Sequence, residues 1–339
     1  MKVADPGQVT GAGLRPPEEH PVTAAPDQAT SLRPVRIGTQ VIGGTRLPVL
    51  AGPRQGADVV HLSLRRQHGA ASAEAELEEI RSRTAAPLLV EPFSADDLAA
   101  VARFADGVVV GGAWMQDFRL LTAVGRTGLP VVLHRGHHCT VDEWLSSAEY
   151  LVAEGNDAVV LCEAGSRRYW GGRTTLDLAL ITEVRDRSGR PVIVDVGDTP
   201  WLAGAAVAAG ADGVWLAEDA AAADVAAAVD ATTTLTPVVR HVDPPSFAGC
   251  REAIDRVDAA FASLLEYRVA LVAAVQRHKP VAGHAGRDRT REAEIVHAMA
   301  HRAPSVPRRQ LAKIMDAVIT AGLDAAEAAG AGGPPVWRI

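Results

Sequence analysis

Short runs of apolar, largely β-branched residues recur from residue 47 to residue 216, and this repetition limits the possible folds more than any other feature. Alanine- and leucine-rich segments with a helical pattern, such as 97–105, 143–154 and 201–209, lie between most of the runs. Strands that alternate with helices indicate parallel βαβ units, and eight units in about 200 residues favour a (β/α)8 barrel of the TIM type. A doubly wound open sheet is the alternative. The predicted strands are 47–51, 59–64, 87–91, 107–110, 131–133, 158–161, 192–195 and 213–216.

The first βα unit of this pattern is reduced. Only residues 52–58 separate the first predicted strand from the second, whereas a crossover connection needs about a dozen residues or more. We therefore expect either that the first helix is missing or that the barrel is open at this point.

The chain changes character on both sides of the predicted barrel, which we place over 36–230. Residues 1–35 are rich in Pro, Ala, Gly and Thr and lack the apolar stretch of a signal peptide, so we expect a disordered arm. Threonines and an Asp-Pro-Pro-Ser sequence predict a linker over 231–246. Apolar residues then recur at helical spacing and predict an all-α domain over 247–329, with helices near 246–280, 289–301 and 307–329. The tail, 330–339, is predicted to be irregular.

Composition excludes several classes of partner and location. The net charge is −7 and no basic stripe is present, which argues against nucleic acid as a partner. No apolar run reaches about 18 residues, so we expect no contact with a membrane interior. Cys139, Cys162 and Cys250 form no disulfide framework and fit free thiols in a reducing compartment. We therefore expect a cytoplasmic protein.

Short motifs follow one another in order along the predicted barrel: Ala51-Gly52-Pro53, Met115-Gln116-Asp117-Phe118, Arg135-Gly136, Leu161-Cys162-Glu163, Arg173-Thr174-Thr175-Leu176-Asp177 and Ala208-Ala209-Gly210-Ala211-Asp212-Gly213. Together they resemble the type I-beta 3-deoxy-arabino-heptulosonate 7-phosphate (DAHP) synthases, the phosphoenolpyruvate aldolases that open the shikimate pathway. The resemblance covers most of 45–220 and implies the barrel fold for that segment.

The same resemblance places unsuitable residues at the metal site of the family, which binds a divalent ion through a Cys, a His, a Glu and an Asp. Arg54 stands at the position of the Cys, Asp198 at that of the His, and Ala217 at that of the Glu, with Glu218 one step away. We find no match for the Asp. Without a Lewis acid the aldol reaction loses a main source of charge stabilisation, so we expect no metal or cofactor.

The phosphate-binding groups of the family are also changed. His134 replaces the lysine that precedes Arg-Gly, and only 65–67 (Arg-Arg-Gln) stands where the family has a Lys-Pro-Arg-Thr-Ser loop. Arg135 and Arg173 could still form an anion site, or they could be structural. We expect an inert or regulatory barrel, and we keep residual DAHP synthase activity as an alternative.

The helical region carries a second ordered set of motifs: Arg251-Glu252-x-Ile254-Asp255, Leu264-Leu265-x-x-Arg268, Val275-x-x-x-Lys279, Arg287-Asp288-x-x-Arg291-Glu292 and Ile314-Met315-x-x-Val318-Ile319. Their order and spacing resemble the intertwined three-helix class of chorismate mutases. These isomerases rearrange chorismate, a dicarboxylate, to prephenate in aromatic amino acid biosynthesis. The catalyst needs no acid, base or nucleophile, but it must select a compact conformer and stabilise charge on the ether oxygen. Arginine suits the carboxylates because it binds them with paired, planar hydrogen bonds.

The resemblance implies a set of site residues. Arg251, reaching in from a partner chain, and Arg268 would hold the carboxylates, while Lys279 would meet the ether oxygen. The acidic residues would lie near the ring hydroxyl, and Arg291 would support the site. The implied catalytic residues are Arg268, Lys279 and Glu292, and the implied substrate-binding residues are Arg251, Asp288 and Arg291.

Residue spacing agrees with this assignment. Arg268 and Lys279 are 11 residues apart, about three helical turns, and therefore share one face of the first helix. Asp288, Arg291 and Glu292 stand at i, i+3 and i+4 and also share a face. The alternative is that these residues form ordinary ion pairs on the surface.

The third helix departs from the family pattern. A Ser and a Gln of the family correspond to Gly322 and Ala326, and Glu327 is displaced by about 100° around the helix. Losing one preorganised donor costs about 10²–10³ in rate. We therefore expect a chorismate mutase that is slow or acts on an analogue such as aminodeoxychorismate or isochorismate. A non-catalytic regulator or partner of a shikimate-pathway enzyme is the remaining alternative.

The length of the first helix predicts a homodimer. A helix of about 33 residues is near 50 Å long, and the shorter second and third helices cannot cover it. Pairing with a second chain about a two-fold axis would bury the rest of its apolar stripe.

Overall fold

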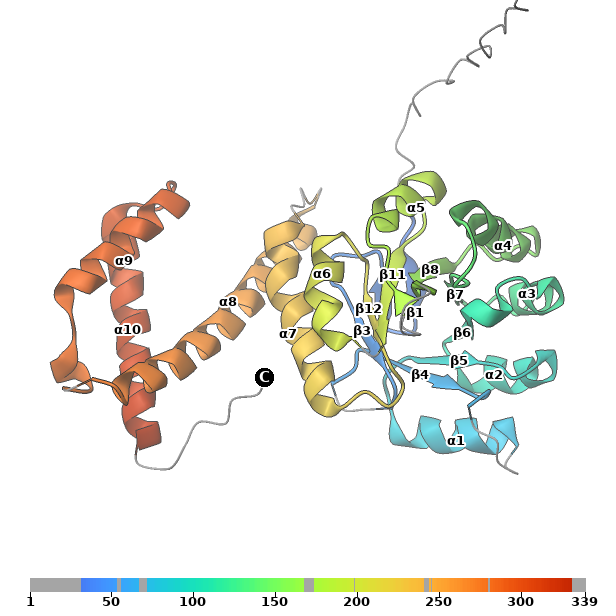
Figure 1. The fold of residues 1–339 in the computed structure, drawn as a ribbon, viewed down its shortest axis with the longest axis horizontal. Coiled ribbons are helices and arrows are strands. Elements are labelled where there is room, and N and C mark those ends of the chain that lie inside the picture. The colour runs from blue at the N-terminus through green and yellow to red at the C-terminus, as the bar shows by residue number, and fades with distance from the viewer. Residues whose placement is uncertain are drawn as a thin grey trace, which may run out of the picture.

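The computed structural model describes residues 32–53, 56–66, 72–167, 174–197, 199–240, 244, 246–279 and 281–330. The predicted N-terminal arm falls outside these residues as far as residue 31, and the predicted tail falls outside them from residue 331. Figure 1 shows a barrel surrounded by helices and, connected to it through α8 (Phe247–Gln276), a smaller group of helices.

Within the described residues, eight parallel strands form a closed barrel in the order β11-β12-β3-β4-β5-β6-β7-β8. The predicted (β/α)8 architecture is therefore confirmed, and the open sheet is wrong. β3 pairs directly with β4, with Leu50 opposite Val59, and none of the described residues between them is helical. The strands are β3 (Val49–Ala51), β4 (Val59–Ser63), β5 (Leu88–Glu91), β6 (Gly107–Val110), β7 (Val131–His134), β8 (Val159–Glu163), β11 (Val192–Gly197) and β12 (Val214–Leu216).

Helices surround the barrel and bury the outward-facing side chains of the strands. Leu77 of α1, Leu121 of α3 and Trp144 of α4 are fully buried in this layer. The helices are α1 (Ala73–Arg83), α2 (Leu98–Phe104), α3 (Phe118–Gly125), α4 (Val141–Ala153), α5 (Leu180–Ser188), α6 (Ala203–Ala208) and α7 (Ala222–Val239), with 3₁₀ turns η1 (Ala95–Asp97), η2 (Gly112–Trp114) and η3 (Pro200–Leu202).

Two short hairpins were not predicted, because strands of two or three residues leave little pattern in a sequence. β1 (Val35–Ile37) pairs with β2 (Gln40–Ile42), and β9 (Ser166–Arg167) pairs with β10 (Thr174–Thr175). The first hairpin buries Ile37 and Ile42 against side chains of the barrel interior. The prediction that the N-terminal arm extends to residue 35 is therefore wrong: the Arg33 backbone N–H already donates to the Gly189 carbonyl at 2.8 Å.

The predicted linker over 231–246 is helical as far as Val239, where α7 ends. Thr232 and Thr236 are buried, and the Thr232 hydroxyl donates to the Val229 carbonyl at 2.9 Å. Threonine has a low helix propensity, but hydroxyls satisfied within the helix and packing against α6 and α8 outweigh it here.

The described part of the C-terminal region forms three helices, as predicted: α8 (Phe247–Gln276), α9 (Arg289–Arg302) and α10 (Arg308–Gly330), with a 3₁₀ turn η4 (His284–Gly286). α8 packs against both α7 and α10, whereas Val296, Leu311 and Met315 form a small core between α9 and α10. No helix in the described part of the chain is long and apolar enough to cross a membrane.

Candidate active site in the helical domain

A cavity of about 360 Å³ lies among α8, α9 and α10. It gathers Arg268, Lys279, Asp288, Arg291 and Glu292, which are five of the six site residues that we predicted for this region. Its apolar wall consists of Leu271, Val272, Val275, Ile295, Ile319 and Leu323. A cavity with apolar walls and cationic groups at its edge suits a small apolar ligand that carries anionic groups.

Arg268 projects from α8 toward α10. Its guanidinium Nη1 donates to the Val318 carbonyl at 3.3 Å. A Cβ added at Gly322 would lie 3.3 Å from the same Nη1 and 3.4 Å from a methyl carbon of Val272. The glycine therefore lets the Arg268 guanidinium lie close to the backbone of α10, where a larger residue would press against it.

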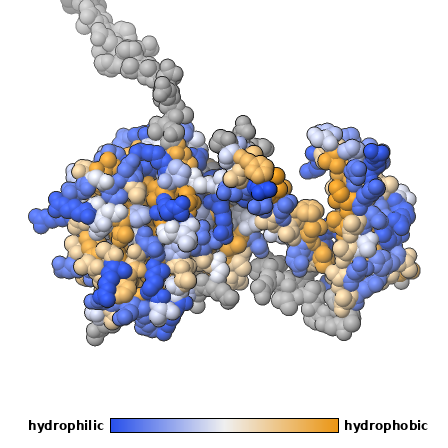
Figure 2. All heavy atoms as spheres, turned by 180° about the vertical axis from the view of Figure 1, so that it is seen from behind, coloured by the Kyte–Doolittle hydropathy of each residue, from blue (hydrophilic) through white to orange (hydrophobic). Residues whose placement is uncertain are grey.

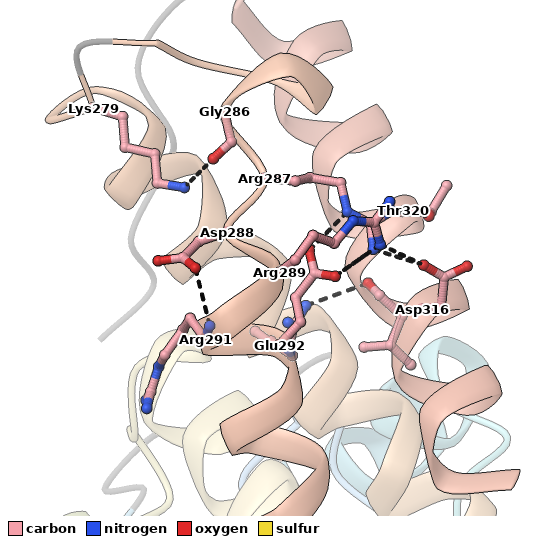
Figure 3. A network of polar contacts seen from close by, with 11 residues as sticks. Lys279, Gly286, Arg287, Asp288, Arg289, Arg291, Glu292, Asp316 and Thr320 are labelled. Carbon is pink, nitrogen blue, oxygen red and sulfur yellow. Dashed lines mark hydrogen bonds and ion pairs between the residues drawn. The ribbon is translucent and has the colours of Figure 1, made fainter. Parts of the chain in front are cut away.

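Lys279 lies just beyond the C-terminal end of α8. Its ammonium Nζ donates to the Gly286 carbonyl at 2.8 Å, as Figure 3 shows. The nearby loop is also held by the Gln276 side-chain oxygen, which accepts from the Gly283 N–H at 2.8 Å. An ammonium group has three donors, and only the one that binds Gly286 is used by the residues that the structure describes.

Glu292 forms an ion pair with Arg287, a residue whose role sequence reasoning missed. The Arg287 guanidinium donates to both carboxylate oxygens of Glu292, at 2.7 and 2.9 Å, and to Asp316 at 2.6 Å (Figure 3). Hydrogen bonds from Arg287 lower the pKa of the Glu292 carboxyl and that of the Asp316 carboxyl below their usual ranges. Glu292 is therefore ionised and fixed in position. The signal that could have revealed this contact is the cation directly before Asp288, the N-cap of α9.

Asp288 and Arg291 line the cavity but also make local contacts. The Asp288 side chain caps α9 by accepting from the Arg291 N–H at 3.0 Å. The Arg291 guanidinium donates to Glu294 at 3.0 Å, and both side chains are exposed. In the single chain, Arg291 and Glu294 therefore form an ordinary surface ion pair, which was the alternative to a role in the site.

Arg251 does not reach this cavity. It lies in the first part of α8, 17 residues before Arg268, which corresponds to about 25 Å along the helix. Its guanidinium is stacked over the Phe247 ring at 4.3 Å from the centroid. Within one chain Arg251 cannot share the site, so its assignment rests on the predicted partner chain.

Glu327 does not replace the missing donors of the third helix. Its carboxylate accepts from the His284 N–H at 3.2 Å and so holds the loop between α8 and α9. Neither Glu327 nor Ala326 is among the residues that line the cavity.

Arg135, at the end of the barrel, differs from Arg268 because it is buried and makes several hydrogen bonds within the chain. Arg135 is buried and donates to Glu163 at 2.5 and 2.7 Å, to the Ser166 hydroxyl at 3.0 Å and to the Cys139 carbonyl at 3.1 Å. These contacts occupy four of the five N–H donors of its guanidinium and favour the structural alternative for Arg135, whereas the anion site stays a prediction. Arg173 lies outside the described residues.

The metal of the DAHP synthases does not fit the residues present. In the described part of the chain, no three His, Cys, Asp or Glu side chains come together as ligands for an ion. Two carboxylates at the strand ends are engaged within the protein: Glu163 binds Arg135, and Glu91 accepts from the Ser63 hydroxyl at 2.5 Å. Arg54 and Asp198, at two of the predicted metal positions, lie outside the described residues.

Comparisons with known proteins match both parts of the chain. The DAHP synthetase I family matches residues 68–239, and chorismate mutase type II matches residues 250–326. A phospho-2-dehydro-3-deoxyheptonate aldolase of Thermotoga maritima is 36% identical over 146 residues, which are 41% of this chain and 43% of that protein. A 2-dehydro-3-deoxyphosphooctonate aldolase of Acidithiobacillus ferrooxidans is 26% identical over 158 residues, which are 41% of this chain and 56% of that protein. The chain thus spans about half the length of the curated relatives that it matches.

Solved structures give a similar result. A truncated form of 3-deoxy-D-arabino-heptulosonate 7-phosphate synthase from Thermotoga maritima superposes with a TM-score of 0.50 and 29% identity, covering 55% of this chain and 80% of that chain. A phospho-2-dehydro-3-deoxyheptonate aldolase (DAHP synthase) from the same organism gives a TM-score of 0.55 and 27% identity, covering 61% and 74%.

Proposed function

The chain belongs to the DAHP synthetase I family and carries a chorismate mutase type II domain, and on this premise we propose that it rearranges chorismate to prephenate in a mutase domain over 247–329. The observation that carries the proposal is the cavity among α8, α9 and α10, in which Arg268 and Lys279 lie together above an apolar wall. The barrel, in this proposal, is not a working synthase.

The charged side chains of the cavity suit a dicarboxylate. Among the described residues, Arg268 and Lys279 each make one hydrogen bond, to a backbone carbonyl. Most of their N–H groups are therefore available for carboxylates and for the ether oxygen. As the C–O bond of chorismate breaks, negative charge grows on that oxygen, and the Lys279 ammonium would stabilise it. The apolar wall would hold the ring in its compact conformer.

Glu292 would accept a hydrogen bond from the ring hydroxyl of chorismate. Its carboxylate is ionised because Arg287 binds both oxygens, and an ionised carboxylate is a strong acceptor. Arg287 also lines the cavity, but its guanidinium is engaged by Glu292 and Asp316, so in this account it is a positioning residue that fixes Glu292.

We further propose that the active form is a homodimer built on α8. This helix exposes an apolar stripe, while another side of it packs against the barrel: Ala260 is buried, and Arg256 and Ala259 lie beside Thr232 of α7. Figure 2 shows hydrophobic residues along the inner side of the helical part of the molecule. A second chain would cover the stripe and bring its Arg251 to the cavity. The exposed stripe consists of Ile254, Val257, Phe261 and Leu264, and it continues into Leu271 and Val275 of the cavity wall.

The test is an assay of the purified full-length protein with chorismate, in which prephenate formation is followed by chromatography. We expect Arg268→Ala and Lys279→Ala to lower kcat/KM at least about 10²-fold. Arg277→Ala and Lys313→Ala remove the same charges from exposed positions on α8 and α10 and should leave the rate unchanged. Wild-type rates in both cavity variants would show that the site is wrongly assigned.

An analogue of chorismate is the second candidate substrate, and a specific observation favours it. Gly322 and Ala326 provide no side-chain donor on α10, so the ether oxygen of chorismate would lack one contact there. Incubating the protein in parallel with chorismate, isochorismate and aminodeoxychorismate decides between the substrates, because the true substrate will have the highest kcat/KM.

A further inference from the structure

Gln276 is the last residue of α8 and lines the cavity of the helical domain. Among the described residues that line this cavity, it has the one uncharged polar side chain. The mutase function proposed above uses Arg268 and Lys279 and gives Gln276 no part. We propose that the amide NH₂ group of Gln276 donates a hydrogen bond to the ether oxygen of the substrate, beside the Lys279 ammonium. This role rests on the proposed function.

The orientation of the Gln276 amide is fixed by a contact of its oxygen. The side-chain oxygen accepts from the Gly283 backbone N–H at 2.8 Å. A backbone N–H can only donate, so the oxygen of the amide, and not its nitrogen, must face Gly283. The NH₂ group carries two donors, and neither binds a residue that the structure describes. Because the side chain lines the cavity, these donors are available to a ligand there.

Gln276 and Lys279 are held by the same loop in the same way. Gln276 binds the backbone of Gly283, and Lys279 binds that of Gly286, each at 2.8 Å. Both contacts join residues seven positions apart, so the two side chains extend side by side from the end of α8 to the loop. Both also line the cavity. A neutral amide donor is therefore placed next to the ammonium donor.

The loop that holds both side chains is itself fixed by α10. Gly283 has a φ of +68°, which favours glycine, and a Cβ at this position would collide with the Glu327 carboxylate. Glu327 accepts from the His284 N–H at 3.2 Å, and the Asp324 carboxylate lies 2.7 Å from Nε2 of the His284 imidazole. The Gln276 amide is therefore preorganised, which is the condition for a donor to stabilise charge in a transition state.

The ether oxygen is the group of the substrate that best suits an uncharged donor at this place. The two carboxylates suit the arginines, which bind them with paired hydrogen bonds. The ether oxygen has two lone pairs, and Lys279 fills one of them in the proposed function. Within the described residues, α10 contributes only the apolar side chains of Ile319 and Leu323 to the cavity. Gln276 thus supplies from α8 the second donor that α10 lacks.

The first measurement is the kcat of the full-length protein with Gln276→Leu, which removes the amide but keeps a similar side-chain volume. The substrate is whichever of chorismate, isochorismate and aminodeoxychorismate has the highest kcat/KM, because all three carry the same enolpyruvyl ether. We expect kcat to fall about 10²-fold, as is typical when one preorganised donor is lost. Gln310→Leu, the same change at the exposed start of α10, should leave kcat unchanged.

The second measurement separates a contact with the ether oxygen from a structural role of Gln276. It compares the Kd of two bicyclic diacids with the shape of the transition state, one with an oxygen in the bridge and one with a methylene group there. The ratio of the methylene Kd to the oxygen Kd should fall roughly tenfold in Gln276→Leu and in Gln276→Glu. Gln276→Glu keeps an acceptor for the Gly283 N–H, and its added charge acts on both diacids alike. It therefore keeps the test valid if Gln276→Leu does not fold.

Two results would overturn this role of Gln276 and leave the proposed function intact: an unchanged kcat in Gln276→Leu, or an unchanged Kd ratio in the folded variants. A wild-type protein that converts none of the three substrates would instead overturn the proposed function, and the role of Gln276 with it.

Discussion

Arg135 of the barrel and Arg268 of the helical domain differ in how many hydrogen bonds they make within the chain. Arg135 of the barrel is buried and makes four hydrogen bonds to its own chain, two of them to Glu163. Arg268 of the helical domain makes one hydrogen bond, to a backbone carbonyl, in the part of the chain that the structure describes. Four of the five N–H donors of Arg135 are used within the fold and stabilise it, whereas an arginine with free donors at the edge of a cavity can bind a ligand. An arginine in a family motif therefore stabilises the fold in the barrel and is available to bind a ligand in the helical domain.

The largest expected effect concerns the site that two chains would share. Arg251→Ala and Lys279→Ala should each lower the mutase rate at least about 10²-fold. A mixed dimer would place both lesions in one site and leave the other site intact. Random refolding makes about half of the dimers mixed, so roughly a quarter of the wild-type activity should return. The measurement is the chorismate assay after joint denaturation and refolding. Mixed dimers without recovered activity would show that Arg251 does not act across the interface.

Removing Arg135 from the barrel should destabilise the fold more than removing Arg268 from the helical domain. Arg135→Ala leaves the Glu163 carboxylate buried without its cation, and such losses cost about 3–5 kcal/mol of folding free energy. We expect this cost in urea denaturation of the full-length protein. Arg268→Ala should change stability by less than about 1 kcal/mol, because it removes one backbone contact. Equal stability losses in the two variants would contradict the contrast between them.

A smaller effect is expected for Arg287. Arg287→Ala releases the Glu292 carboxylate from one of its partners, while Arg289 still donates to it at 3.0 Å. We expect kcat/KM to fall roughly 10- to 100-fold because Glu292 is no longer held in place. Arg302→Ala, an exposed change near the end of α9, is the control. An unchanged rate would mean that Arg287 has no positioning role.

The pH dependence of the folding stability tests the ion pairs that Arg287 makes with Glu292 and Asp316. Arg287 lowers the pKa of Glu292 and of Asp316 in the folded state. Their contribution to stability is therefore complete above the ordinary carboxyl pKa of about 4 and is lost as the pH falls through the lowered values. The stability difference between wild type and Arg287→Ala should consequently shrink between pH 7 and pH 2.5 in urea denaturation.

For the synthase activity of the barrel we expect no effect of added metal, because we expect no activity. The barrel should not condense phosphoenolpyruvate with erythrose 4-phosphate, with or without Mn²⁺, because Ala217 and His134 stand where the family has a metal ligand and a lysine. Metal-dependent formation of heptulosonate above background, measured with the full-length protein, would show that the barrel has kept its chemistry.

The spacing of apolar residues along the chain was enough to predict most of the fold. The β-branched runs marked every barrel strand, and the helical spacing of residues such as Ile254 and Phe261 marked α8. The β1–β2 hairpin and the last turns of α7 were missed, because their stability comes from burial against distant residues and not from their own sequence.

Site residues that lie close together in the sequence could be predicted from their spacing. The roles of residues that depend on contacts with distant parts of the chain could not. Arg268 of α8 and Lys279, three residues past the end of α8, both line the cavity, as their spacing of 11 residues indicates. The pairing of Arg135 with Glu163 joins residues 28 positions apart on neighbouring strands. No local pattern distinguishes such a pair from an open anion site.

The packing of α8 on α7 also limits where the chain can be truncated. A fragment that starts at residue 246 would lose α7 and uncover the side of α8 that carries Ala260, which is 5% exposed in the full chain. The remaining fragment would depend on the small core around Val296, Leu311 and Met315. The shortest excised piece that keeps this side of α8 covered therefore begins at Ala222, inside what the sequence assigns to the barrel.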